Sequence, residues 1–347
     1  MEKFKKQLFM AVGISLIIIV GITIYTVDPS TWQALQNLNL IYLLIIFLAI
    51  ILAWTINGLK LKTMAAGVGF KLPLIKAIEL GLVDRFFSNI TPSGIGGQPV
   101  KILALSKFNI TSGKASAIVV VELLLRLLFF ALSLPFIFIK VHNLFVSFVS
   151  IRLLYIGIPL LIIALGAVIY FLLYKPRTLV KIFFGILNLK LFEKLLNPKI
   201  IYAWKRTLAE EIKIFYETIW LYLKEGKFQL FLGLILTGFL WIIRFSILYF
   251  IIRGFNLEVD LGFVILIQFL VYTVVLFIPV PGGSGVEVIL VSLLHRTLPV
   301  SLIGITVASW RFFNYYTYII FGGIITFKVF HLEKSVEEIE YKGRQSK

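Results

Sequence analysis

The chain has 347 residues, of which 60% are hydrophobic and 15% charged, and its mean hydropathy is +0.99. Soluble domains are usually nearer half apolar and a quarter charged, so this composition excludes a soluble globule and indicates a protein whose solvent is lipid. The lack of cysteine excludes disulfides and thiolate metal sites, and three histidines scattered along the chain disfavour a histidine metal cluster. The net charge of +17 is explained better by membrane topology than by binding to nucleic acid.

The first apolar segment follows a basic N-terminus. A membrane span needs about 20 mainly apolar residues to cross roughly 30 Å of hydrocarbon, and Leu8–Val27 is long enough. A signal peptide is the alternative, but its apolar core is usually about half this length and precedes a small-residue cleavage site. We therefore expect a retained first helix, and a first region of residues 1–40 made of this helix and an external loop.

Further along the chain, five more segments have the length and composition of spanning helices. They are Ile41–Leu59, Ala115–Ile139, Leu153–Tyr174, Phe228–Ile252 and Val300–Phe327. Two other apolar segments are interrupted by turn-forming residues. Leu74–Ile90 runs into TPSGIGGQP, and Leu261–Val280 runs into PGGSG before a short apolar piece, Val286–Leu294.

Basic residues are concentrated in alternate connections between these segments. Of the 34 lysines and arginines, 26 lie at the N-terminus, in 60–76, 101–114 and 175–227, and in the tail. The positive-inside rule places these on the cytoplasmic side. Six spanning helices satisfy the rule only if Leu74–Leu105 re-enters from the cytoplasm and Leu261–Leu294 re-enters from outside. We therefore predict an all-α polytopic protein of the cell membrane, with about six spanning helices, two re-entrant hairpins and both termini cytoplasmic.

The two hairpins predict an inverted repeat, an arrangement common in transporters, whose broken helices meet near the membrane midplane. The first repeat covers residues 41–174 and the second covers 228–330. Between them, residues 175–227 are expected to form amphipathic helices on the cytoplasmic face, with a solvated connector as the alternative. Residues 331–347 form a charged cytoplasmic tail.

Eight ionisable residues lie within apolar segments, where charge is costly and therefore suggests function. They are Glu79, Asp84, Arg85, Glu122, Arg126, Arg244, Glu287 and Arg311. Four acids and four arginines suggest internal pairing. Glu122 and Arg126 are four residues apart, so they lie on one helix face and are able to pair. Asn314, about one turn after Arg311, is expected to share its face.

The two glycine–proline turns are candidate binding sites. Backbone N–H groups freed at a turn, together with a helix N-terminus, can bind an anion, and Arg85 adds a charged group suited to phosphate. The predicted substrate-binding residues are Arg85, Asn89, Pro92, Gly94, Gly96, Gly97, Gln98, Glu122, Arg126, Pro281, Gly282, Gly283, Gly285, Glu287, Arg311 and Asn314. The alternative is that these residues have structural roles. The glycines and prolines would then break the helix and pack the hairpin, Glu287 would cap its helix, and the charged residues would form salt bridges.

At these motifs the chain resembles a known family. T-P-S-G-I-G-G-Q-P-V-K, preceded by Arg85 and Asn89, and P-V-P-G-G-S-G-V-E are similar to the two motifs of the lysylphosphatidylglycerol synthase transmembrane region, also called flippase-like domain proteins. The resemblance covers about residues 5–330, and it implies an integral membrane protein that moves a phospholipid between leaflets or handles polyprenyl lipids. The bifunctional synthases continue into a soluble aminoacyltransferase domain, whereas this chain ends at Lys347, so we expect it not to make lysylphosphatidylglycerol.

We therefore expect a lipid translocase that binds a phosphate-bearing headgroup, of a phospholipid or polyprenyl-type lipid, between the two hairpins. An ion-coupled small-solute transporter is the alternative, and a membrane enzyme acting on lipid-linked substrates is a third. The sequence contains no Walker, Rossmann or H-E-x-x-H motif, and no catalytic constellation, so we expect no enzyme activity, no cofactor and no metal. The expected partners are the bilayer and the lipid, without nucleic acid, and a homo-oligomer is left open.

Overall fold

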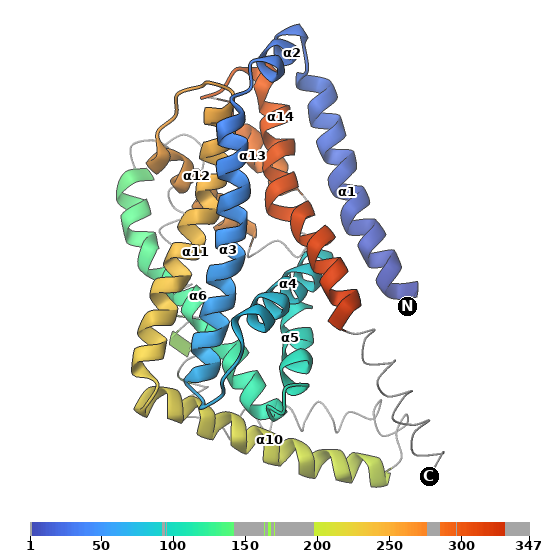
Figure 1. Cartoon of the computed structure of the whole chain (residues 1–347), viewed down its shortest axis with the longest axis vertical. Helices are drawn as coiled ribbons and strands as arrows, with labels where there is room; N and C mark the ends of the chain where they lie inside the picture. The colour runs from blue at the N-terminus through green and yellow to red at the C-terminus, as the bar shows by residue number, and fades with distance from the viewer. Residues whose placement is uncertain are drawn as a thin grey trace. The chain divides into compact units, whose positions relative to one another are not determined.

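The computed structural model describes residues 2–91, 94, 96–141, 163, 166–167, 170, 198–275, 285–295 and 297–329 (Figure 1). These parts are helical apart from short turns and loops, and no strand occurs among them. The all-α class of polytopic membrane protein is therefore confirmed. The predicted span Leu153–Tyr174, apart from isolated helical positions, lies outside the described residues, as do residues 276–284 and the tail 331–347.

The helix boundaries largely follow the apolar segments of the sequence. In chain order the helices are α1 Glu2–Thr26, α2 Pro29–Gln36, α3 Leu40–Ala66, α4 Leu74–Ile90, α5 Gly97–Ser106, α6 Ser112–Val141, α10 Pro198–Lys224, α11 Lys227–Gly254, α12 Leu261–Val275, α13 Val286–Leu294 and α14 Val300–Arg311. A π-helical segment, η1 (Phe312–Tyr316), continues α14, and helix then resumes to Val329. The sequence analysis missed α2, which begins after the capping residue Asp28.

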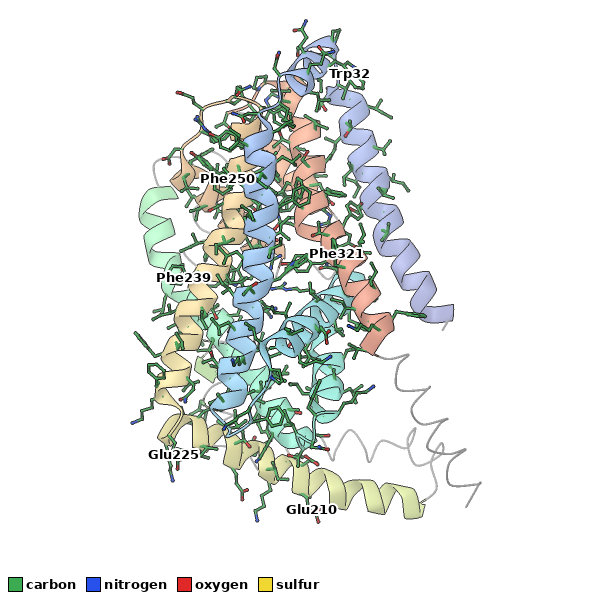
Figure 2. All side chains as sticks on the ribbon, viewed as in Figure 1. Trp32, Glu210, Glu225, Phe239, Phe250 and Phe321 are labelled. Carbon is green, nitrogen blue, oxygen red and sulfur yellow. The ribbon has the colours of Figure 1, made fainter. Side chains whose placement is uncertain are left out.

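Several helices present apolar side chains on their outer faces. On α3, exposed apolar residues recur every three or four positions, at Leu40, Leu44, Phe47 and Ile51. On α11, Phe239 is 55% exposed (Figure 2). A continuous apolar stripe of this kind indicates contact with lipid rather than water.

Span candidates can be counted among the described residues only. Helices α3, α6 and α11 are long and apolar enough to cross a membrane, and α1 with α2 forms a fourth candidate that is bent by 104°. The prediction of about six spans and an inverted repeat goes beyond these four, so it stays a prediction.

The chain divides into two compact units. Unit 1 contains residues 1–59, 73–101 and 239–347, and unit 2 contains 60–72 and 102–238. This division by packing differs from the order of the predicted regions along the chain, which stay a prediction.

Unit 1 is built around one apolar core. Helices α3, α11, α12, α13 and α14 contribute buried side chains that include Ile50, Leu248, Ile267, Leu290 and Ile303. Helix α1 packs closely on α14, because a Cβ added at Gly304 would lie 2.1 Å from the Thr26 Oγ1. Small residues at such crossings let membrane helices approach one another. This close crossing therefore holds the N-terminal helix against α14.

The helices beside the glycine–proline turns are short. Helix α4 has 17 residues and α5 has 10, so at 1.5 Å per residue they are about 25 and 15 Å long and neither alone spans the hydrocarbon. After the turn, Gln98 and Lys101 of α5 contact Asp84 of α4, at 3.4 and 3.5 Å. The chain thus returns along α4, as the predicted first hairpin requires, while its depth in the bilayer stays a prediction.

In unit 2, helix α10 packs across the first turn of α6. The Glu211 carboxylate accepts a hydrogen bond from the Gly113 backbone N–H, where a negative charge also favours the helix dipole. The Tyr222 hydroxyl donates to the Met64 carbonyl at the end of α3. The opposite face carries charge, since the side chains of Lys213 and Glu217 are 77% and 63% exposed. An amphipathic helix thus lies within 175–227, and its position on the cytoplasmic face stays a prediction.

Helix packing in unit 1 predicts the effect of a single methyl group. A Cβ at Gly322 would lie 2.7 Å from the Leu82 carbonyl oxygen and 2.8 Å from the Phe86 Cβ. We expect Gly322→Ala to lower the free energy of unfolding by about 1–3 kcal/mol, the usual cost of overpacking. Thermal unfolding of the purified protein in detergent measures this. The control Gly21→Ala, where a Cβ meets nothing within 4 Å, should not lower Tm, and equal losses in both variants would contradict the prediction.

Tyr222 predicts a pH dependence of stability. Burial raises the pKa of its phenol well above the usual value, and the Glu122 carboxylate raises it further. The folded protein therefore holds this proton more tightly than the unfolded chain. The stabilisation is complete below about pH 10 and is lost as the pH rises, by up to about 1.4 kcal/mol per pH unit. Thermal unfolding at increasing alkaline pH should show a shallower loss for Tyr222→Phe than for the wild type. Identical slopes would show that this phenol does not contribute.

Candidate functional site

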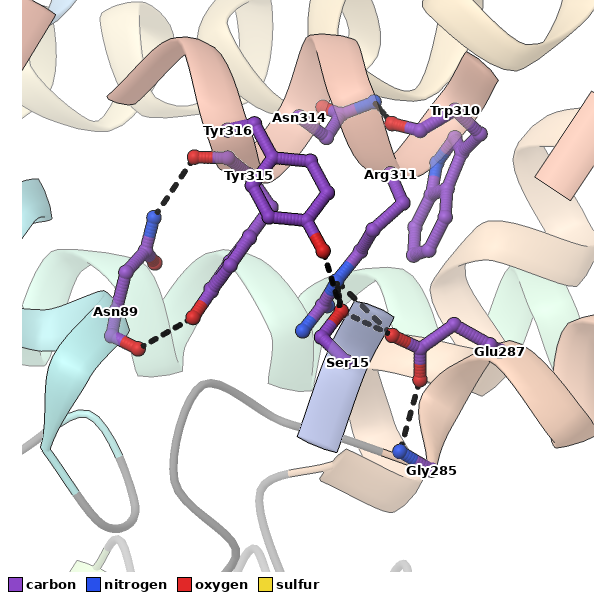
Figure 3. A network of polar contacts seen from close by, with 9 residues as sticks. All are labelled: Ser15, Asn89, Gly285, Glu287, Trp310, Arg311, Asn314, Tyr315 and Tyr316. Atoms are coloured by element: carbon purple, nitrogen blue, oxygen red, sulfur yellow. Dashed lines mark hydrogen bonds and ion pairs between the residues drawn. The ribbon is translucent and has the colours of Figure 1, made fainter. Parts of the chain in front are cut away.

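A polar network lies among the apolar helices of unit 1 (Figure 3). The Arg311 Nε, at the end of α14, lies 3.0 Å from the Oε1 of Glu287, in the first turn of α13. The Ser15 hydroxyl of α1 donates to the same Oε1 at 3.1 Å and accepts a hydrogen bond from Arg311 Nε at 3.0 Å. Ser15 and Glu287 are fully buried and Arg311 is 4% exposed. The ion pair is therefore shielded from water and held by three helices.

Glu287 also binds Gly285, the last glycine of the second glycine–proline motif. Its Oε2 accepts a hydrogen bond from the Gly285 backbone N–H at 2.8 Å. Gly285 has a φ of +97°, a left-handed conformation that glycine adopts without steric cost. Glu287 thus fills both roles considered from the sequence, because one oxygen stabilises the start of α13 and the other pairs with arginine. Pro281, Gly282 and Gly283 lie outside the described residues.

Asn89, in the last turn of α4, joins the first motif to the same region. Its carbonyl accepts a hydrogen bond from the Tyr315 hydroxyl at 3.1 Å, and its side-chain Nδ2 donates to the Tyr315 carbonyl at 3.5 Å. Tyr315 also lies under the Arg311 guanidinium, with 3.9 Å between Cζ and the ring centroid. The next residue, Tyr316, donates to Ser15 at 3.2 Å. The π-helical segment η1 therefore contacts Asn89 beside the first motif, and it contacts Arg311 and Ser15, which bind Glu287 of the second motif. π-bulges are often found at functional sites.

The glycines of the first motif shape its turn. Gly94 has a φ of +66°, and the Gly96 N–H donates to the Thr91 hydroxyl at 2.9 Å. Gly97 lies directly against α4, because a Cβ there would be 2.3 Å from the Asp84 carbonyl oxygen. These contacts give the glycines a structural role, and their predicted role in binding substrate stays a prediction. Pro92 lies outside the described residues.

Two buried lysines were missed as ion-pair partners by sequence reasoning. Lys101 is 3% exposed and lies 3.5 Å from Asp84 Oδ2, and Lys60 is 8% exposed and lies 3.5 Å from Glu122 Oε1. The sequence analysis counted both lysines only as charges of cytoplasmic connections. Their long side chains reach carboxylates on neighbouring helices. The spacing of residues along the sequence does not predict ion pairs between different helices. Arg126, the residue expected to pair with Glu122, is half-buried on the same helix.

The remaining predicted site residues occupy two places in unit 1. Asn314 is buried and donates its side chain to the Trp310 carbonyl at 3.4 Å, within its own helix. The half-buried Arg85 of α4 has its guanidinium carbon 6.0 Å from the ring centroid of Trp241 on α11. Across the described part of the chain, no group of three or more histidine or carboxylate side chains could hold a metal ion. The contacts within the network are ion pairs, hydrogen bonds and a cation–π contact.

Comparison with known proteins agrees with these motifs. The family described as the lysylphosphatidylglycerol synthase TM region matches residues 8–322, which is most of the chain. The chain belongs to this family. A UPF0104 membrane protein of Archaeoglobus fulgidus is 27% identical over 301 residues, covering 86% of this chain and 90% of that protein. A UPF0104 membrane protein of Pyrococcus horikoshii is 23% identical over 342 residues, covering 93% and 97%. The resemblance drawn from the two motifs is confirmed, and the chain is a multi-pass membrane protein.

The buried ion pair predicts a non-additive effect of substitution. Arg311→Met leaves the Glu287 carboxylate buried without its partner, so we expect the free energy of unfolding to fall by about 3–5 kcal/mol. The double variant Glu287→Leu with Arg311→Met removes both charges and should recover most of this loss. Thermal unfolding of the single and double variants in detergent gives the coupling between the two residues. A double variant as unstable as the sum of both single variants would contradict a direct pair.

Proposed function

We propose that this protein is a membrane lipid translocase that binds a phosphate-bearing lipid headgroup at the Arg311–Glu287 pair. Family membership supports a lipid-related role, because the matched region takes its name from the synthase of a phospholipid. The observation that carries the proposal is the buried pair itself, which contacts the second motif through Gly285 and the first through Tyr315 and Asn89.

A contribution to the stability of the fold is a weak explanation for a buried ion pair. Removing two charges from water costs several kcal/mol per ion, and an apolar pair of similar size is often as stable or more stable. Ionisable residues within membrane helices therefore mark substrate or ion pathways more often than they mark simple packing. In this protein Glu287 lies in the first turn of α13 beside the Gly285 turn, and Arg311 lies where α14 passes into a π-helical segment, so the hydrogen-bonding pattern beside both residues is irregular. Residues there can exchange partners with less disruption than within a regular α-helix.

The proposed binding step is an exchange of ion pairs. Arg311 supplies a planar, permanently charged group that suits phosphate oxygens. Glu287 matches a cationic part of the headgroup, such as an ammonium. When the headgroup enters, the internal pair is replaced by two pairs with the lipid, so both charges remain compensated. The acyl chains stay in the bilayer beside the exposed apolar faces of α1 and α3.

Transport in proteoliposomes tests this proposal. Fluorescent phosphatidylglycerol, phosphatidylethanolamine, aminoacylated phosphatidylglycerol and a polyprenyl phosphate are each followed by chemical quenching of the outer leaflet. We expect the wild type to accelerate exchange of at least one of them over protein-free vesicles. Arg311→Lys keeps the charge but loses the planar donor geometry, and Glu287→Gln removes the carboxylate. Each should slow transport by about tenfold or more, the effect of about 1.4 kcal/mol of binding or barrier.

The controls separate transport from folding. Lys213→Ala changes an exposed basic residue on α10 and should leave transport unchanged. Thermal unfolding and gel filtration confirm that each variant is folded before it is reconstituted. Transport rates of Arg311→Lys and Glu287→Gln equal to the wild type would remove the pair from the mechanism. Exchange of none of the four lipids, together with uptake of a soluble anion, would instead favour an ion-coupled solute transporter.

A further inference from the structure

Arg244 is a buried cation with an unusual environment in α11. It is 4% exposed, and no carboxylate pairs with it among the residues that the structure describes. Its guanidinium carbon instead lies 4.9 Å from the ring centroid of Trp241, 5.8 Å from that of Tyr272 and 5.6 Å from that of Tyr318. The four acids of the apolar segments, Glu79, Asp84, Glu122 and Glu287, are paired elsewhere, with lysines or with Arg311. Arg244 is therefore surrounded by aromatic rings.

The hydrogen-bonding capacity of Arg244 is mostly unused among the residues that the structure describes. Its Nη2 donates to the Tyr272 hydroxyl at 3.4 Å, which is a long hydrogen bond. Neither Nε nor Nη1 has an acceptor within the described ranges, although a guanidinium carries five N–H donors. Arginine does not lose its proton in proteins, so the group cannot avoid its charge by titration. Cation–π contacts recover only part of the cost of burying a charge, so the aromatic rings alone do not compensate it.

A second arginine lies beside the same indole. The Arg85 guanidinium carbon is 6.0 Å from the Trp241 ring centroid, so two guanidinium groups lie near one aromatic side chain. Arg85 is half-buried and belongs to the last turns of α4, which lead into the first glycine–proline turn, whereas Arg244 is buried in α11. Two cations around one ring in an apolar core attract an anion more strongly than either does alone, because low polarity strengthens charge interactions.

We propose that Arg244 and Arg85, both beside Trp241, bind a phosphate group within unit 1 with the help of the Tyr272 hydroxyl. Arg244 supplies N–H donors to the phosphate oxygens, Tyr272 can add its hydroxyl proton, and Arg85 closes the site from the less buried side. The phosphate belongs either to a lipid headgroup or to a free phosphate ion. The residues of this site differ from those of the Arg311–Glu287 pair, so the site does not depend on translocation being the function.

Binding to the purified full chain in detergent tests the site. The probes are dioctanoyl-phosphatidylglycerol, inorganic phosphate, and dioctanoylglycerol, which has the same acyl chains without phosphate. We expect the wild type to bind dioctanoyl-phosphatidylglycerol and Arg244→Gln to bind it about 10- to 100-fold more weakly, as expected for lost charge-assisted hydrogen bonds. Arg85→Gln should weaken binding by a smaller factor. Displacement of the lipid by inorganic phosphate identifies free phosphate as a ligand, and failure of displacement identifies the headgroup.

Matched controls keep the test specific. Arg253→Gln removes an arginine from the far end of the same helix, where it contacts Tyr42, and should keep the wild-type affinity. Transport that Arg311→Lys and Glu287→Gln leave unchanged, together with lipid binding that depends on Arg244, would count against the translocase proposal alone. Equal affinity of wild type and Arg244→Gln, or equal binding of phosphatidylglycerol and dioctanoylglycerol, would overturn the site. If Arg244→Gln does not fold, the proposal is tested with Arg85→Gln. An unchanged affinity of that variant for dioctanoyl-phosphatidylglycerol would overturn the proposal.

Discussion

A charge placed among apolar membrane helices has to be compensated where it lies, and the described part of this protein is organised by that requirement. Glu287 with Arg311, Asp84 with Lys101, and Glu122 with Lys60 each join two helices within one unit. Every such pair brings together segments that are separate in the chain, and it does so with directional contacts that apolar packing cannot supply. The apolar core holds the helices together, and the ion pairs set which positions face each other.

Two different solutions to this requirement occur within unit 1. Arg311 is compensated by a carboxylate and a hydroxyl, and in the proposed function it exchanges this carboxylate for the phosphate of a lipid. Arg244 is surrounded by aromatic rings that only partly offset its charge. The first arrangement suits a group whose binding and release are balanced, as in transport. The second suits a site that retains an anion, because leaving an arginine without an anion in this environment is costly.

Many of the helices could be predicted, because an apolar run in the sequence indicates a membrane-spanning helix and a glycine–proline cluster indicates where a helix ends. Helices α4 and α13 have the bounds expected of their apolar segments, and the two motifs identified the family before any comparison. The partners of the charged residues could not be predicted. Glu122 contacts Lys60 of another helix, and Asn89 contacts Tyr315, which lies 226 positions away in the chain. Such contacts depend on which helix faces are packed together. The periodicity of apolar residues along the sequence does not indicate which faces those are.

The sequence by itself determined that the protein lies in a membrane, the class of its fold and the position of its first glycine–proline turn, because composition and local propensity decide these. Only the tertiary structure decided that Ser15, Glu287 and Arg311 form one network and that Arg244 and Arg85 lie near the same indole. The physical reason is that a buried charge is satisfied by whichever group packing brings within a few ångströms. That choice is made between helices, after each helix has already been specified by its own residues.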